Sequence, residues 1–149
     1  MRVVVDANIV FSAILNTDGK IGDLLLNSGR HLVFIAPYFL KAEIGKHIDR
    51  LSTLSGLTTE QVLESEYKVC KNITFISEEQ IKPSSWLEAE ALVSDIDPKD
   101  TTYLAYTRHF RCKLWSGDKQ LLRGLKRKGF LNCIDTSQLF DIREQKMRK

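Results

Sequence analysis

Short apolar runs alternate with helical patterns along the whole of this 149-residue chain. The first run, at residues 2–5, is β-branched and ends at an aspartate, and further runs occupy residues 31–36, 73–76, 112–115 and 130–134. Runs of this length are typical of strands that are buried on both faces of a parallel sheet. The alternation predicts an α/β fold in three layers, α/β/α, with a mainly parallel central sheet of about five strands in a single domain, residues 1–149.

Local signals place helices between these strands. Thr58 and Gln61 form a capping box, and Ser85 and Glu88 form a second one. Pro37 suits the first turn of a helix that runs to about residue 51. The other helices are expected at residues 9–15, 21–27, 98–110, 118–128 and in the C-terminal tail, and residues 16–19 are expected to form a loop.

The bulk composition is that of an ordinary globular protein, with 43% hydrophobic and 28% charged residues. No apolar run approaches the ~20 residues that cross a bilayer. A signal peptide is not expected either, because an acid interrupts the first apolar run, so we expect a cytoplasmic protein without a membrane partner. Cys70, Cys112 and Cys133 are widely spaced and form no CxxC pair, so we interpret them as buried apolar residues.

The net charge is +3, and the basic residues concentrate in the last third of the chain. This asymmetry is compatible with a polyanionic partner. Solvated helix faces and a frayed tail explain it equally well. The clustered basic residues are Arg108, Arg111, Lys113, Arg123, Lys126, Arg127, Lys128, Arg143, Lys146, Arg148 and Lys149.

Acidic residues recur where the predicted strands end. Asp6 follows the first strand and Asp118 lies just past the fourth, while Asp97 and Asp100 open the helix before the fourth strand. Glu43 lies about two turns into the helix after the second strand. Ligands of open parallel sheets bind at the carboxyl ends of the strands, so these side chains are expected to meet there.

Each acid alone has another explanation, as a helix cap, a partner of the helix dipole or a surface residue. Several like charges at one edge are nevertheless costly unless a cation neutralises them. Oxygen ligands favour Mg²⁺ or Mn²⁺ over zinc. A metal of this kind supports phosphoryl chemistry without a histidine, and His31, His47 and His109 are not placed as an obvious general base.

Four segments in register resemble the PIN-domain family, the ribonuclease fold of VapC-type toxins. They are VVDAN followed by Ser12, APYFLKAEI, IDPKDTTYLA and WSGDKQLL. The resemblance implies four acids around one or two metal ions, with further polar residues in support. The implied metal ligands and catalytic residues are Asp6, Glu43, Asp100 and Asp118, and the supporting residues are Asn8, Ser12, Asp97 and Ser116.

What the resemblance implies for activity is metal-dependent endonucleolytic hydrolysis of single-stranded RNA, with Mg²⁺ or Mn²⁺ as cofactor. It also implies an antitoxin partner and a homodimer. Many relatives have threonine at the position of Ser116, and the hydroxyl is kept here. Arg108, Arg111 and Lys119 are candidate RNA-binding residues.

Three other interpretations compete with this one, and a missing acid argues against the first two. A haloacid-dehalogenase-like phosphatase needs an acid two residues after Asp6, where this chain has Asn8. A receiver-type signalling domain needs an aspartate after the third strand, where this chain has Ser77 and then two glutamates. The third reading is a catalytically silent PIN-like module that binds RNA or an antitoxin.

Overall fold

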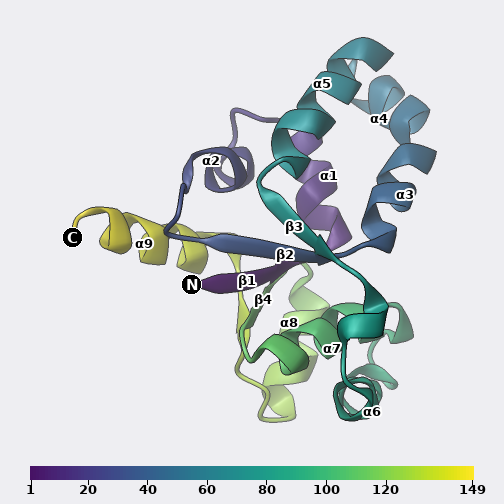
Figure 1. Cartoon of the computed structure of the whole chain (residues 1–149), viewed down its shortest axis with the longest axis vertical. Coiled ribbons are helices and arrows are strands. Elements are labelled where there is room, and N and C mark those ends of the chain that lie inside the picture. Colours follow the sequence, from purple (N-terminus) through teal and green to yellow (C-terminus); the bar gives the residue numbers. More distant parts are fainter.

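The computed structural model describes all 149 residues and contains one five-stranded, fully parallel sheet (Figure 1). The order of its strands is β3-β2-β1-β4-β5. This arrangement confirms the predicted α/β class and strand number. The strands are β1 (Arg2–Val5), β2 (Val33–Pro37), β3 (Ile73–Ile76), β4 (Lys113–Trp115) and β5 (Cys133–Ile134).

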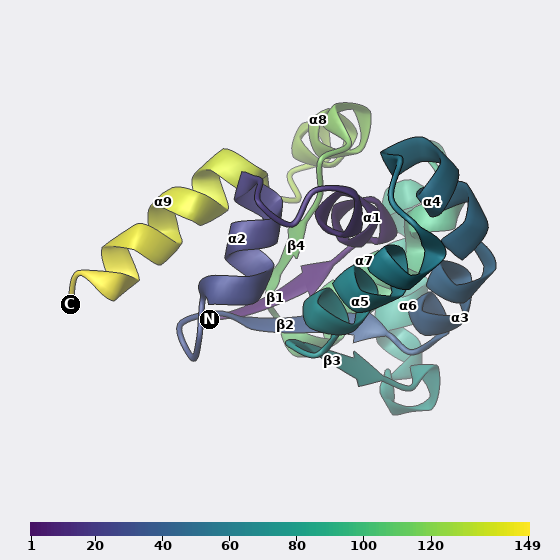
Figure 2. The same cartoon turned by 90° about the horizontal axis from the view of Figure 1, so that it is seen from above.

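Helices cover both faces of the sheet, as predicted. In Figure 1 the helices α1, α3, α4 and α5 lie on one side of the strands, and α6, α7 and α8 lie on the other. Figure 2 shows α9 running beside α2 and projecting beyond the body. The α-helices are α1 (Ala7–Leu15), α2 (Lys20–Asn27), α3 (Phe39–Lys46), α4 (Ile48–Ser55), α5 (Thr59–Cys70), α6 (Pro83–Val93), α7 (Thr101–Phe110), α8 (Lys119–Arg127) and α9 (Thr136–Met147), with 3₁₀ turns at Glu78–Gln80 and Pro98–Asp100.

The core forms on both faces of β1. Val3 and Val5 point into a cluster with α1, α2 and α5, while Val4 points into a second cluster with α6, α7 and α8. All three valines are fully buried. A strand in the middle of a two-faced sheet needs an unbroken apolar run, which explains the opening sequence. None of the helices is both long and apolar enough to cross a membrane.

Strand order fixes where a site can lie. The chain adds β2 and β3 on one side of β1 and then returns to add β4 and β5 on the other side. In an open α/β sheet, such a reversal leaves a crevice at the carboxyl ends of the two strands that flank it. Val5 pairs with Trp115, so the residues that follow β1 and β4 emerge side by side at that edge.

Four local predictions differ from the structure. Pro37 ends β2 instead of opening a helix. The helix expected to run to residue 51 is two helices, because the backbone of His47 (φ −107°, ψ 10°) leaves the helical region between α3 and α4. Ser85 is buried inside α6, which starts at Pro83, because proline suits the first helical position better than any later one. The fifth strand is also shorter than expected.

A buried arginine attaches α9 to α2. Arg143 is only 3% exposed, and its Nη2 lies 2.5 Å from Oδ2 of Asp23 and 2.8 Å from Oε1 of Glu144. The Nη1 group also donates to the carbonyl of Asp23 at 3.3 Å. At the start of α9, Trp115 Nε1 donates to Thr136 Oγ1 at 3.1 Å. Arg143 is thus a structural cation, unlike the exposed basic residues of α8.

The three cysteines are unpaired and partly buried, which agrees with the prediction of small apolar residues. Burial raises the pKa of the Cys70 and Cys112 thiols to about 11 and that of Cys133 to about 12. Thiols with these pKa values stay protonated at neutral pH and are poor nucleophiles.

Candidate active site

Asp6 lies at the point where β1 becomes α1. It is 6% exposed and serves as the N-cap of α1, because Oδ1 accepts a hydrogen bond from the Ile9 N–H at 3.0 Å. The Asp6 N–H continues the β1–β4 ladder by donating to the Trp115 carbonyl at 3.4 Å. The cap uses only Oδ1 of this carboxylate, and Oδ2 is not part of it. Asp6 can therefore be both the cap of α1 and a residue of the site.

Ser116 links the acids that follow β1 and β4. Its side chain is fully buried and accepts a hydrogen bond from the Asp118 N–H at 3.1 Å, and its hydroxyl lowers the pKa of Asp6. Asp118 in turn caps α8, since its Oδ1 accepts from the Leu121 N–H at 3.1 Å. Ser116 thus contacts the backbone of Asp118 and acts on the charge of Asp6.

Asp97 and Asp100 enter from the opposite helical layer, on the 3₁₀ turn that precedes α7. Asp97 Oδ1 accepts from the Lys99 N–H at 3.0 Å and closes this turn. Asp100 makes no such cap, and its Oδ2 atom is buried without a hydrogen-bond partner. A buried carboxylate oxygen without a partner is uncommon in proteins and marks a group available to a ligand.

The four aspartates interact through their charges. Burial raises the pKa of Asp6, the hydrogen bond from Ser116 opposes this, and the charge of Asp118 adds to it. Burial is also the main cause that raises the pKa of Asp100 to about 6, followed by the charges of Asp97, Asp6 and Asp118. The structure therefore brings these four predicted residues into one acidic cluster at the carboxyl edge of the sheet.

Glu43 lies at the border of this cluster. Its carboxylate is partly exposed and lies 3.6 Å from Lys46 Nζ on the same helix and 3.9 Å from Nε2 of His47, where that helix ends. The connection to the aspartates is Tyr103, a buried residue that sequence reasoning missed. Burial raises the pKa of the Tyr103 hydroxyl, and the charges of Asp6, Asp100 and, last, Glu43 raise it further. Its position one turn after Asp100 was the available signal.

The remaining predicted residues divide into near and distant ones. Asn8 and Ser12 are exposed on α1, one turn apart, and Asn8 lines a cavity of about 240 Å³ with Phe11 and His47. Lys119 follows Asp118 directly. Arg108 and Arg111 are not brought to the acids, because they lie at the far end of α7, where the chain enters β4; Arg108 Nε pairs there with Glu88 Oε2 at 2.7 Å.

The donor set fits a hard divalent cation. It offers carboxylate and hydroxyl oxygens only, which Mg²⁺ and Mn²⁺ prefer, and it includes the orphaned oxygen of Asp100. No three acidic, histidine or cysteine side chains gather tightly enough to hold an ion on their own. One oxygen each of Asp6 and Asp118 is already used for capping. The acids thus form a cluster of interacting charges and not a closed ligand set.

Because the pKa of Asp100 is raised, the substitution Asp100→Asn should increase the stability of the fold, by an amount that depends on pH. The pKa of about 6 lies above the ordinary 3.8, so the ionised group weakens the fold above about pH 6, and this penalty fades as the pH falls below that value. Removing the charge in EDTA should stabilise the protein by about 1 kcal/mol at pH 8, after allowance for solvent screening. That gain corresponds to a melting temperature about 2–4 °C higher.

The same substitution should have little effect on the melting temperature at about pH 4, below the pKa of the folded state. Asp141→Asn, which removes an exposed acid from α9, is the control and should leave the melting temperature unchanged at both pH values. A loss of stability with Asp100→Asn at both pH values would mean that the carboxylate supports the fold.

No curated protein matches the sequence. One chain of the crystal structure of VapBC2 from Rickettsia felis, bound to a DNA fragment from their promoter, has a similar fold. The two chains share 14% sequence identity, the match covers 91% of this chain and 97% of that one, and the TM-score is 0.59.

The sequence comparison gives the family. The family model of the PIN domain matches residues 4–140, a range that contains β2 to β5, the second half of β1 and helices of both layers. PIN domains are nucleases and generally use divalent metal ions. The chain belongs to the PIN domain family.

Proposed function

We propose that this PIN domain is an endoribonuclease that hydrolyses phosphodiester bonds of single-stranded RNA with the help of Mg²⁺ or Mn²⁺, as the toxin of a toxin–antitoxin pair. The observation that carries the proposal is the acidic cluster at the β1/β4 edge, with the orphaned oxygen of Asp100 inside it. The full set of acids argues against the silent-module reading, because a module that only binds RNA gains nothing from repelling carboxylates.

The metal ligands in this proposal are Asp6, Asp100 and Asp118, with Glu43 as a further ligand or as a residue that orients water. When bound, such an ion supplies positive charge that polarises the phosphate and lowers the pKa of water.

Other residues of the chain hold the acidic side chains in place. Asp6 is held by the first turn of α1 and by Ser116, so its free oxygen has little freedom to move. Ser116 also fixes the backbone of Asp118. Tyr103 is buried within reach of the charges of Asp6, Asp100 and Glu43, which raise the pKa of its hydroxyl after burial does. A preorganised set of this kind needs little rearrangement when a charged substrate arrives.

The direct test is incubation with a defined panel of RNAs, with and without Mn²⁺. We expect Mn²⁺-dependent cleavage of single-stranded members that EDTA stops, with products that carry a 5′-phosphate and a 3′-hydroxyl. Binding of RNA without turnover, in every metal tried, would favour the silent module instead.

Metal binding should also be visible without any substrate. Because a cation relieves repulsion in the folded state only, Mg²⁺ or Mn²⁺ at about a hundred times its Kd should add about 2.7 kcal/mol of stability. For a chain of this length the melting temperature should rise by about 5–10 °C. The double variant Asp6→Asn/Asp100→Asn should lose this response. If millimolar metal leaves the melting temperature of the unaltered protein unchanged, the result counts against the metal site.

An antitoxin is the partner that we propose. The fold is similar to a chain of a VapBC2 complex, whose name records two components bound to promoter DNA. Co-expression of this chain with the product of an adjacent open reading frame, followed by co-purification and a cleavage assay, tests the pairing. Inhibition of RNA cleavage by the co-purified partner is the expected result.

A further inference from the structure

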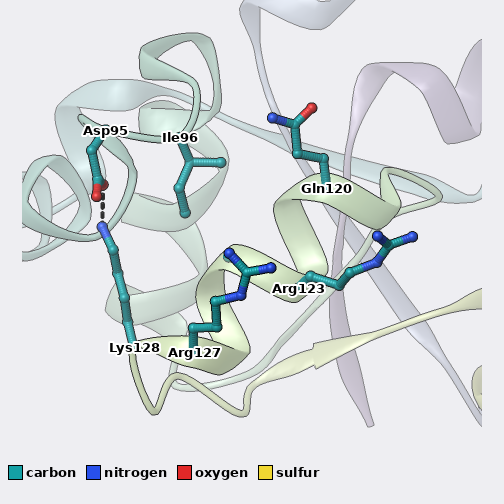
Figure 3. A pocket seen from close by; sticks show the side chains of 7 residues that line it. Asp95, Ile96, Gln120, Arg123, Arg127 and Lys128 are labelled. Carbon is teal, nitrogen blue, oxygen red and sulfur yellow. Dashed lines mark hydrogen bonds and ion pairs between the residues drawn. The ribbon is translucent and has the colours of Figure 1, made fainter.

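A cavity of about 600 Å³ lies outside the acidic cluster, between α8 and the loop from α6 to α7. One wall is the face of α8 that carries Gln120, Arg123 and Arg127, and the opposite wall is Asp95 and Ile96 (Figure 3). We call this cavity the α8 groove. Its floor is Gly124, where an added Cβ would lie 2.6 Å from Cδ1 of Ile96. The glycine thus permits the close approach of loop and helix.

The basic side chains of the groove have two different roles. Lys128 Nζ donates to the Leu92 carbonyl at 2.7 Å and pairs with the Asp95 carboxylate, so it fastens α8 to the end of α6. Arg123 and Arg127 have no carboxylate within ion-pair distance. In Figure 3 the guanidinium of Arg127 lies between the Asp95–Lys128 pair and Arg123. Two free guanidinium groups beside a cavity suit phosphate oxygens, which they bind in bidentate geometry.

Both walls of the groove lead directly to the acidic cluster. Asp118 caps the helix that carries the arginines, and Asp97 follows Ile96 on the opposite wall. At 1.5 Å of rise per residue, Arg123 and Arg127 lie about 8 and about 14 Å along α8 from Asp118. A stacked strand advances about 3.4 Å per nucleotide, so these distances correspond to about two and four nucleotides.

We propose that the α8 groove binds the sugar–phosphate backbone of the RNA substrate, about two to four nucleotides away from the bond that is cleaved. This inference rests on the proposed function, because it takes the acidic cluster as the place of cleavage. Arg123 and Arg127 are the substrate-binding residues, and Lys128 is a structural one. The contacts are to phosphates, so the groove holds RNA without selecting its sequence.

The experiment compares Arg123→Gln/Arg127→Gln with a matched control, Arg30→Gln/Arg148→Gln. The control removes two exposed arginines that have no ion-pair partner either, one in the loop before β2 and one at the end of α9. Affinity for a fluorescent single-stranded RNA is measured by anisotropy over a range of salt concentrations. All proteins carry Asp6→Asn so that the RNA stays intact.

Loss of two phosphate contacts should raise the Kd about tenfold at moderate salt and reduce the slope of log K against log salt by about 1.4. With Asp6 restored, KM for RNA should rise by a similar factor while kcat stays within about twofold. The control should behave as the unaltered protein does. An unchanged Kd or salt slope overturns the groove assignment.

A polyglutamate peptide forms a separate arm of the same titration. If the arginine variant loses polyglutamate binding but keeps its RNA affinity, the groove takes an acidic protein segment and the RNA assignment is wrong. If no RNA is cleaved by the protein with Asp6 intact, the proposed function fails. The anisotropy data still show in that case whether the α8 groove binds RNA, because they do not depend on turnover.

Discussion

Asp6→Asn should lower the rate of RNA cleavage by about two to three orders of magnitude, the usual cost of removing one preorganised electrostatic contact. Asparagine keeps the shape of the side chain and can still cap α1 through its amide oxygen, as aspartate does at Ile9 N–H. It removes the charge that a divalent cation needs. The measurement is the single-turnover rate on an RNA that the unaltered protein cleaves, with excess Mn²⁺.

The fold of this variant should persist, and its melting temperature without metal should not fall, because a buried like charge has been removed. Asp141→Asn removes one exposed carboxylate of α9, outside the cluster, and is the control for net charge. Full activity of folded Asp6→Asn protein would show that the cluster is not the place of cleavage.

Gly22→Ala should be among the most destabilising single substitutions in the chain. Gly22 is buried in the first turn of α2, and an added Cβ would lie 2.3 Å from the backbone oxygen of Thr17 and 2.6 Å from its carbonyl carbon. Backbone atoms cannot move aside as a side chain can, so the loop before α2 must shift. Overpacking of this kind costs about 3 kcal/mol. The melting temperature should fall by about 6–12 °C.

Gly45→Ala is the matched control, since the same methyl group is added to another helix. Gly45 is exposed on α3, and nothing lies within 4 Å of an added Cβ. Alanine is the better helix former, so this variant should gain up to about 1 kcal/mol. Thermal denaturation of the two variants side by side separates crowding from helix propensity. Equal melting temperatures would contradict the close approach at Gly22.

The architecture was predictable because its signals are local. The valine run of β1 and the capping box at Thr58 lie in short segments whose conformation neighbouring residues decide, and the structure has both. Positions that depend on tertiary contacts were missed. Pro37 pairs across the sheet with Ile76, and no local rule shows that β2 extends so far. The break at His47 separates two segments that look like one helix in the sequence.

The acidic cluster was predictable from two things together. Asp6 and Asp118 directly follow strands that local signals identify, and the fold class restricts the order of those strands. What the sequence does not give is how side chains from different layers meet. Tyr103 borders the cluster because α7 packs against β1, and the α8 groove exists because Ile96 approaches Gly124. Both depend on contacts between segments that are separated along the chain.

The position of β1 in the middle of the sheet has a consequence for protein synthesis. Its neighbour β2 follows soon after, but the other neighbour is β4, and Val3 pairs with Lys113. While the ribosome is still making the intervening helices, Asp6 therefore stands at an open sheet edge without Ser116 or Asp118 beside it. A nascent chain cannot complete the cluster until Ser116 and Asp118 have been translated. The order of strands thereby delays the assembly of the acidic cluster until β4 and the residues that follow it have been made.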